Sequence, residues 1–391
     1  MGSGSDEYSV LVVGAGFAGS VMAERIASRL DQRVLVVDRR PYVGGNAHDR
    51  IDEAGIRVHL HGPHLFHTKA EVVVDYLSRF TDWWPYEHRV LASVDGRLVP
   101  IPINGNTLRE LYGVDLDEEG VARFLSERAE PRSEVRNSED VVVSRVGREL
   151  YERLFRGYTR KHWGIDPAEL SATVAGRIPV RTNRDDRYFT DYHQALPAEG
   201  YTAMFERMLD HPNIDVQLST SYEDVRDEVA FDHLVYTGPI DAFYDYRFGS
   251  LPYRSLRFEW ERVATPDGGL VQPVTQINYP DESIPFTRTV EYRHLYGQRG
   301  PRSAISREFP TSDGEPFYPI PTPRNRERYR RYKAVAAADP KVTFVGRLAR
   351  YQYLNMDQVT AQALSTFERL RPVLQDAVGG RQRTRRVISA R

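Results

Sequence analysis

The chain has 391 residues, too many for one ordinary hydrophobic core, so two or three domains are expected. Its 53 Lys and Arg nearly balance 55 Asp and Glu, and the net charge of −2 excludes a general attraction to nucleic acid or to a membrane surface. The absence of cysteine excludes disulfides, thiolate nucleophiles and zinc–thiolate sites, and it agrees with a cytoplasmic protein. Residues 1–7 resemble a flexible tail, and no membrane span is predicted because no run of about 18 apolar residues occurs.

The N-terminal stretch predicts a strand, a glycine turn, a helix and a second strand that together bind a dinucleotide. The apolar strand Val10–Val13 leads into Gly14-x-Gly16-x-x-Gly19, and the second strand ends at Asp38. The first glycine permits the tight turn, the second lets backbone N–H groups approach a pyrophosphate, and the third lets helix and strand pack closely. A carboxylate at the end of the second strand suits an unphosphorylated ribose, which favours FAD or NAD over NADP.

The segment after this strand favours a flavin. Residues 38–46, DRRPYVGGN, place two more glycines and a polar side chain where the chain turns back over the cofactor, as in flavoproteins of the glutathione-reductase type. Besides the motif glycines and Asp38, the candidate contacts here are Phe17, Arg39, Gly45 and Asn46. A Pro/Gly turn without a chemical role is the alternative.

A histidine-rich loop follows, with His59, His61, His64 and His67 close together in the chain. A metal site is one interpretation, but Gly62-Pro63 breaks any helical face and no carboxylate–histidine motif accompanies it, so no metal is expected. We interpret the loop as lying against a cofactor ring, where imidazoles can exchange protons with a heteroatom. A solvated surface loop is the alternative.

The middle of the chain predicts a helix at 70–80, a hairpin at 89–103 turning at Asp95-Gly96, and a helical insertion from 106 to 157. Aromatic, basic and glycine residues then alternate over 154–164. This pattern suggests a site for an aromatic base and its phosphates, and an ordinary helix end with basic side chains is the alternative.

The last half predicts a helix at 200–209, strands at 214–220 and 231–241, and antiparallel strands over 250–310 that would form the floor of a substrate cleft. A strand, a turn at Gly346 and a long helix follow over 341–370, with the helix N-terminus near the cofactor ring. A basic, mobile tail ends the chain.

Taken together, the motifs resemble the bacterial UDP-galactopyranose mutases along nearly the whole chain. They are GAGFAG at 14–19, RPYVGGN at 40–46, HGPHLFHT at 61–68, PIPIN at 100–104, RGYTRKHWG at 156–164, RIPVRTNRDDRYF at 177–189, INYP at 277–280, FTR at 286–288, FYPIP at 317–321 and VGRLARYQYLNMDQV at 345–359.

The resemblance implies an α/β fold with a Rossmann-like FAD-binding domain, a helical insertion domain and a twisted antiparallel sheet domain. The expected boundaries are 8–80, 190–248 and 312–375 for the FAD domain, 104–176 for the insertion, 81–103, 177–189 and 249–311 for the sheet, and 376–391 for the tail. A homodimer or higher oligomer is also implied.

The implied activity is the redox-neutral interconversion of UDP-galactopyranose and UDP-galactofuranose for polysaccharide biosynthesis. It would use reduced FAD, with NAD(P)H or another reductant, through a covalent bond between flavin N5 and the sugar. Arg177 and Arg288 would grip the diphosphate, since guanidinium geometry suits it. By position the resemblance also assigns catalytic roles to His64, Tyr353 and Asn355, substrate contacts to Phe155, Tyr158, Thr159, Trp163, Tyr188, Asn278, Tyr318 and Asn104, and further FAD contacts to His61, Arg347 and Met356.

Three residues depart from the family pattern. Leu154 stands where members often have Phe, His162 replaces Gln before Trp163, and Asn355 stands where many have Asp. A mutase of the same mechanism acting on another nucleotide sugar therefore stays open. Two rival functions are a flavin oxidoreductase, such as an amine oxidase or monooxygenase, and a non-catalytic nucleotide-binding module.

Overall fold

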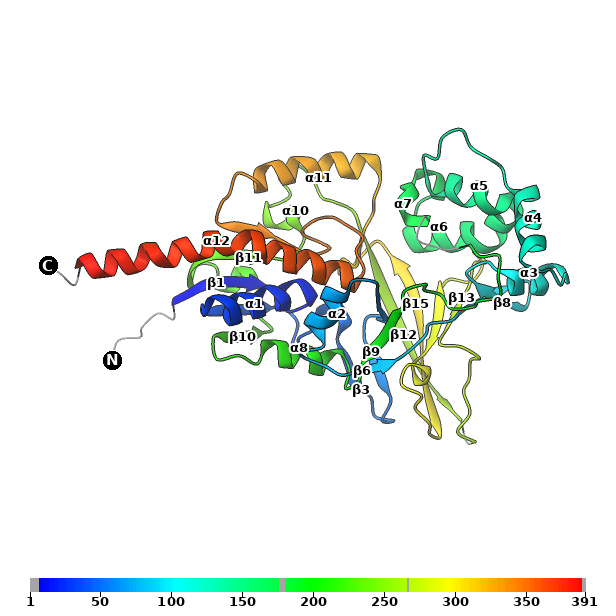
Figure 1. Cartoon of the computed structure of the whole chain (residues 1–391), viewed down its shortest axis with the longest axis horizontal. Coiled ribbons are helices and arrows are strands. Elements are labelled where there is room, and N and C mark those ends of the chain that lie inside the picture. The colour runs from blue at the N-terminus through cyan, green and yellow to red at the C-terminus, as the bar shows by residue number, and fades with distance from the viewer. Residues whose placement is uncertain (1–6, 176–179, 266, 389–391) are drawn as a thin grey trace.

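The computed structural model describes residues 7–175, 180–265 and 267–388, with the backbone alone for 377–388. An α/β layer carries both termini, a large twisted sheet crosses the middle, and a helical part lies at the far end (Figure 1). The predicted fold class is confirmed.

The α/β layer is built on a five-stranded parallel sheet in the order β10-β2-β1-β11-β17. Its strands are β1 (Glu7–Val13), β2 (Val34–Asp38), β10 (Ile214–Leu218), β11 (Ala230–Tyr236) and β17 (Val342–Phe344). Apolar residues succeed one another along β1 because both faces are buried: Val10 and Val12 enter one core and Leu11 enters another. The strand order reverses between β1 and β11, and open α/β sheets bind their ligands at such a point.

Helices cover both faces of this sheet. One face is covered by α1 (Phe17–Leu30), α8 (Tyr201–Leu209) and α12 (Met356–Ile388), and the other by α10 (Ile240–Phe243) and α11 (Pro323–Ala336). In Figure 1, α12 runs alongside α1 and extends beyond the sheet. The separate tail expected from residue 376 is not seen, since α12 continues through that stretch to Ile388.

The second sheet has seven strands in the order β16-β12-β15-β14-β13-β7-β8. They are β7 (Val90–Val94), β8 (Arg97–Ile101), β12 (Tyr253–Ala264), β13 (Gln276–Asn278), β14 (Arg288–Glu291), β15 (Arg302–Thr311) and β16 (Tyr318–Pro319). The hairpin that turns at Asp95-Gly96 is confirmed. The sheet is not wholly antiparallel as expected, because β13 pairs parallel with β7. Such a pair is non-local, so the local sequence pattern carries no sign of it.

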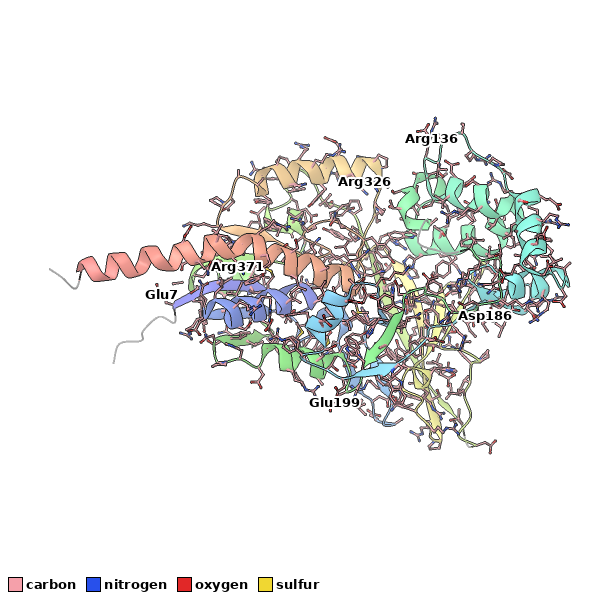
Figure 2. All side chains as sticks on the ribbon, viewed as in Figure 1. Glu7, Arg136, Asp186, Glu199, Arg326 and Arg371 are labelled. Atoms are coloured by element: carbon pink, nitrogen blue, oxygen red, sulfur yellow. The ribbon has the colours of Figure 1, made fainter. Side chains whose placement is uncertain are left out.

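The helical part shares one apolar core with strands β7 and β8. It comprises α3 (Gly105–Tyr112), α4 (Glu118–Arg128), α5 (Ser138–Tyr151), a π-helix (Glu152–Arg156), α6 (Gly157–Trp163), a 3-10 turn (Pro167–Glu169) and α7 (Ala172–Ala175). This confirms the predicted helical insertion. Arg326, at the end of α11 toward this part, donates to Ser171 Oγ at 2.6 Å and so joins the helical part to the α/β layer (Figure 2).

Smaller elements connect these three parts. They are β3 (Asp49–Ile51) paired with β4 (Arg57–His59), the three-stranded sheet β5-β9-β6 of Phe66–Thr68, His193–Pro197 and Trp83–Pro85, the helices α2 (Glu71–Leu77) and α9 (Tyr222–Val225), and the 3-10 turns Gly45–Ala47 and Tyr292–His294. The sheet β5-β9-β6 and the pairing of β16 with β12 cross the expected domain boundaries, which stay a proposal. None of the described helices is both long and apolar enough to cross a membrane.

Candidate active site

A cavity of about 1010 Å³ opens at the carboxyl ends of β1 and β11, where the strand order reverses. The residues expected to contact the cofactor that line it are Gly14, Gly16, Phe17, Asp38, Arg39, Gly45, Asn46, Arg347 and Met356, and His64 lines it as well. Gly19 lies under the turn instead, and His61 lines a neighbouring cavity. The local dinucleotide motif therefore does form one wall of a large cavity.

The glycine turn can close only without side chains. Gly14 has φ of 105°, and a Cβ on Gly19 would lie 1.8 Å from the Gly14 carbonyl oxygen. Asp38 fixes the turn from the next strand, because its carboxylate accepts from the backbone N–H of Ala15 at 2.8 Å and of Arg40 at 2.9 Å. The carboxylate keeps further lone pairs that can accept from a ligand hydroxyl.

The four clustered histidines take different partners. His59 is fully buried and accepts from the His64 backbone N–H at 3.0 Å, while the His64 ring contacts the Gly62 carbonyl at 2.9 Å. His61 contacts the Tyr42 hydroxyl, and His67 Nδ1 lies 2.8 Å from Asp191. The described residues contain no group of three His, Cys, Asp or Glu that could hold a metal ion. Of the four, His64 lines the first cavity, and His61, His64 and His67 line a second cavity that adjoins it. The expected place of the loop against a cofactor ring stays a prediction.

The buried imidazoles of this loop are neutral near pH 7. Burial lowers the pKa of both His59 and His61 to about 4. Burial also lowers the pKa of His64 well below its usual value. The one N–H of the neutral His64 ring is on Nδ1, because Nδ1 donates to the Gly62 carbonyl oxygen, so Nε2 is left as a hydrogen-bond acceptor.

A second cavity, of about 550 Å³, adjoins the first, and His64, Arg347 and Met356 line both. The predicted site residues that line it are His61, Phe155, Tyr158, Thr159, Trp163, Tyr188, Asn278, Arg288, Tyr318, Tyr353 and Asn355. They come from the π-helix, α6, the seven-stranded sheet and three connecting segments, which carry His61, Tyr188, and the pair Tyr353 and Asn355 just before α12. A π-helix is rare and often found at functional sites, and here it turns Leu154 and Phe155 into the wall.

Arg288 is not a free cation, because it forms an ion pair with Glu308 on the neighbouring strand. The Nε–Oε2 distance is 2.6 Å, with side-chain exposures of 17% and 0%. Although burial opposes its charge, the carboxylate of Glu308 raises the pKa of Arg288 well above its usual value. Burial pushes the pKa of Glu308 upward, but a guanidinium at this distance keeps the carboxyl ionised. Sequence reasoning missed Glu308, although the register places it directly opposite Arg288.

Neutral tyrosine hydroxyls surround Arg288. Burial raises the pKa of Tyr188 and of Tyr318 to about 12, and it raises the pKa of Tyr158 still further. These hydroxyls therefore keep their protons and can donate hydrogen bonds to an anion. The Arg347 guanidinium lies 5.4 Å from the Tyr318 ring centre and donates to the Leu354 carbonyl at 2.6 Å, which holds it between the two cavities.

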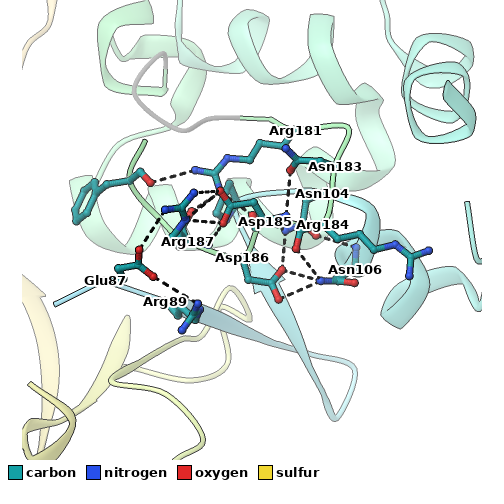
Figure 3. Close-up of polar contacts among 12 residues, drawn as sticks. Glu87, Arg89, Asn104, Asn106, Arg181, Asn183, Arg184, Asp185, Asp186 and Arg187 are labelled. Atoms are coloured by element: carbon teal, nitrogen blue, oxygen red, sulfur yellow. Dashed lines mark hydrogen bonds and ion pairs between the residues drawn. The ribbon is translucent and has the colours of Figure 1, made fainter. Parts of the chain in front are cut away.

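Asn104 does not reach either cavity, which corrects its expected contact with substrate. It is fully buried, caps α3 by accepting from the Thr107 backbone N–H at 3.0 Å, and donates to Asp186 Oδ1 at 2.7 Å (Figure 3). In the same view Arg181 donates to backbone carbonyls of residues 185–189, the segment that contains Tyr188. The Asn104 amide thus holds this segment and has no contact left for a ligand. Arg177, the other expected diphosphate ligand, lies outside the described residues.

Two further cavity residues have no place in the expected set. His67 joins Asp191 to Asn355, whose amide nitrogen lies 3.4 Å from its Nε2. His162 is only 8% exposed, yet its Nδ1 has no hydrogen-bond partner. A buried polar atom without a partner in a cavity wall indicates a group that a ligand completes. The departure of His162 from the family pattern was the signal in the sequence.

Comparisons with known proteins agree with this geometry. A family model described as UDP-galactopyranose mutase matches residues 153–353, and one described as an NAD(P)-binding Rossmann-like domain matches residues 12–80. The chain is 36% identical to a probable UDP-galactopyranose mutase of Klebsiella pneumoniae, over 92% of this chain and 93% of that protein. It is 34% identical to a dTDP-fucopyranose mutase of Escherichia coli, over 91% and 96%.

Solved structures give the same fold. A crystal structure of reduced UDP-galactopyranose mutase superposes with a TM-score of 0.74 at 17% identity, covering 94% of this chain and 96% of that one. A putrescine oxidase superposes with a TM-score of 0.60 at 12% identity, covering 94% and 99%, so the fold alone is shared more widely. Because the family model matches half of the chain and the relatives match nearly all of it, the chain belongs to the UDP-galactopyranose mutase family of isomerases.

Proposed function

We propose that the chain interconverts the pyranose and furanose forms of UDP-galactose, with reduced FAD in the first cavity and the nucleotide sugar in the second. The observation that carries this proposal is that the two cavities adjoin at His64, Arg347 and Met356. A cofactor ring and a sugar meeting there would lie within reach of Arg288, the cation that we assign to the diphosphate.

The residues of the first cavity fit FAD. The turn at Gly14 and Gly16 leaves room for a pyrophosphate beside the N-terminus of α1, and Asp38 supplies a carboxylate for the ribose. The N-terminal end of α12 lies at the junction of the cavities, where its dipole would favour electron density on a reduced ring. When bound and reduced, FAD supplies a nucleophilic nitrogen, N5, toward the anomeric carbon.

The chain's own residues bind, orient and desolvate the substrate. Arg288 would bind the diphosphate with the guanidinium N–H groups that Glu308 does not use. Because the ion pair with Glu308 already holds the Arg288 side chain in place, little reorganisation is needed on binding. The buried hydroxyls of Tyr188 and Tyr318 would donate to phosphate oxygens without adding charge. Neutral His64 at the junction would offer Nε2 as an acceptor for a proton or a hydrogen bond from the reacting sugar, without a second positive charge in the resting site.

A second candidate is a mutase of the same mechanism that acts on another nucleotide sugar. The E. coli relative that is named a dTDP-fucopyranose mutase is nearly as similar to this chain as the K. pneumoniae relative. His162, whose buried Nδ1 has no hydrogen-bond partner, also lines the second cavity, among the residues that we assign to the substrate. A flavin oxidoreductase has less support, since an amine or apolar pocket has no use for a paired arginine.

The test is a spectrum followed by an assay of reduced and oxidised protein. We expect purified protein to carry FAD, to bleach with dithionite, and to isomerise UDP-galactofuranose only when bleached. A screen that includes dTDP-fucopyranose separates the two candidates. Isomerisation by oxidised protein, or protein that binds no flavin, would contradict the proposal.

The diphosphate assignment is tested with Arg288→Ala, which should nearly abolish turnover while FAD stays bound. Arg307→Ala is the matched control, because Arg307 is on the adjoining strand, pairs with Glu261 at 2.6 Å, and lines neither cavity. The same loss of turnover is expected for Arg177→Ala. Full activity in Arg288→Ala would show that the anion is bound elsewhere.

A further inference from the structure

Lys161 reaches from α6 across to the turn that joins β13 to β14. Its Nζ donates to the carbonyl oxygens of Tyr279 at 2.6 Å, Asp281 at 2.7 Å, Ile284 at 2.9 Å and Phe286 at 3.0 Å. An ammonium has three N–H donors, so all of them are used and at least one is shared. The Lys161 ammonium thus binds four backbone carbonyls spread over nearly the whole turn.

The contact is to the backbone of the turn and not to its acidic side chains. The Asp281 carboxylate accepts from the Ser283 backbone N–H at 2.8 Å, and Glu282 pairs with Arg160 at 3.3 Å. Burial lowers the pKa of Lys161 to about 8, while Asp281 and Glu282 oppose that shift, so the ammonium is the main form at neutral pH. Four convergent carbonyls form a cage of the kind that holds a cation.

Lys161 joins α6, which lines the second cavity, to the turn whose two ends carry cavity residues of the sheet. On the sheet wall, Asn278 and Arg288 face each other in register on either side of the turn. On the helix wall, Tyr158 is one of several α6 residues that line the cavity. The walls also touch at Gly157, where a Cβ would lie 2.2 Å from the Pro280 carbonyl oxygen.

We propose that Lys161 is a positioning residue, whose ammonium in the four-carbonyl cage sets the distance between α6 and the turn that carries Asn278 and Arg288. It touches neither the sugar nor the cofactor. Lys161 affects the substrate only through Arg288 and Asn278. The bound group, a nucleoside diphosphate, is taken from the proposed function, and the inference rests on it to that extent. The cage itself does not depend on that function.

The experiment compares Lys161→Ala, which empties the cage, with Lys161→Arg, which keeps the charge but cannot point three donors at one place. Lys333→Ala, on the exposed face of α11, is the control. We measure UDP affinity by calorimetry on the FAD-loaded protein, and hydrogen exchange of the 279–287 amides without UDP. Far-UV circular dichroism and flavin content show whether each variant is folded.

We expect Lys161→Ala to bind UDP about tenfold more weakly or worse, in line with the loss of charge-assisted hydrogen bonds, and to exchange the turn amides faster. Lys161→Arg should lie between Lys161→Ala and the wild type. Methylammonium should restore both properties of Lys161→Ala, and tetramethylammonium, which has no N–H group, should not.

Two results of the exchange and rescue measurements would overturn the inference: unchanged turn exchange in Lys161→Ala, or equal effects of the two ammonium ions. If wild-type protein bound no UDP, the proposed function would fail, but the exchange measurement would still decide whether Lys161 orders the turn. If UDP bound equally well to wild type and to Lys161→Ala, the positioning role would fail while the proposed function stood.

Discussion

The buried pair of Arg288 and Glu308 should contribute far more to stability than an exposed pair of the same length. The charges lie 2.6 Å apart, and their attraction is about 6 kcal/mol at an effective dielectric constant of about 20. Most of this offsets the cost of taking both groups out of water, but removing one partner leaves that cost unopposed, typically about 3–5 kcal/mol. Because Arg288 is still 17% exposed, we expect Glu308→Gln to lie near the lower end, about 3 kcal/mol.

The chain contains its own control. Arg307 and Glu261 are also 2.6 Å apart across the β12–β15 pair, but their side chains are 37% and 46% exposed. Pairs of that kind contribute about 0–1 kcal/mol, so Glu261→Gln should have a small effect. The free energy of unfolding is measured in urea at a fixed FAD concentration, because bound cofactor stabilises the fold by mass action.

A double-mutant cycle completes the test. Arg288→Met strands the carboxyl of Glu308, and adding Glu308→Leu should recover stability, with a coupling of about 1–3 kcal/mol between the two positions. All variants that lack Arg288 should remain inactive, whatever their stability. The reasoning is refuted if Glu308→Gln costs no more than Glu261→Gln, or if the two changes at Arg288 and Glu308 simply add.

Further predictions concern pH, cofactor and ligand. Several histidines are buried with the pKa lowered by burial to about 3 or 4, namely His59, His88, His162 and His233. Below about pH 6.5 the unfolded chain therefore binds more protons than the folded one, and the free energy of unfolding should fall by about 1.4 kcal/mol per pH unit for each of them until the pH nears 4. Urea midpoints at pH 7 and 5.5 check this, and His233→Gln should flatten the slope. Gly19→Val should yield protein without flavin absorbance, since even a Cβ meets the Gly14 carbonyl oxygen at 1.8 Å, whereas Gly300→Ala, with nothing within 4 Å of its Cβ and no left-handed φ, should keep the flavin. His162→Phe removes a buried nitrogen without a partner, so its melting temperature should rise while UDP-galactose affinity falls. An unchanged affinity would mean that no ligand group uses this nitrogen.

Local signals in the sequence were enough to predict much of the fold. The glycine turn, the hairpin at Asp95-Gly96 and the helical insertion are each set within a few consecutive residues, where turn geometry and periodicity act. The parallel pairing of β7 with β13 joins segments that are far apart in the chain. The local pattern of β7 predicts its hairpin with β8 but carries no information about this second partner. The sequence pattern predicts an end of the last helix near residue 370 and a basic tail from 376, whereas α12 extends to Ile388.

For the site, the sequence by itself determined the chemical groups, and tertiary structure decided what each group is free to do. The residue types and motifs identified the family and brought most of the expected side chains to two adjoining cavities. Only the fold revealed that Asn104 uses its amide in a helix cap, that Arg288 is paired with Glu308, and that Lys161 gathers a turn. The reason is physical: a side chain's type sets its possible bonds, but burial and the neighbours that long-range packing supplies determine which bonds remain for a ligand.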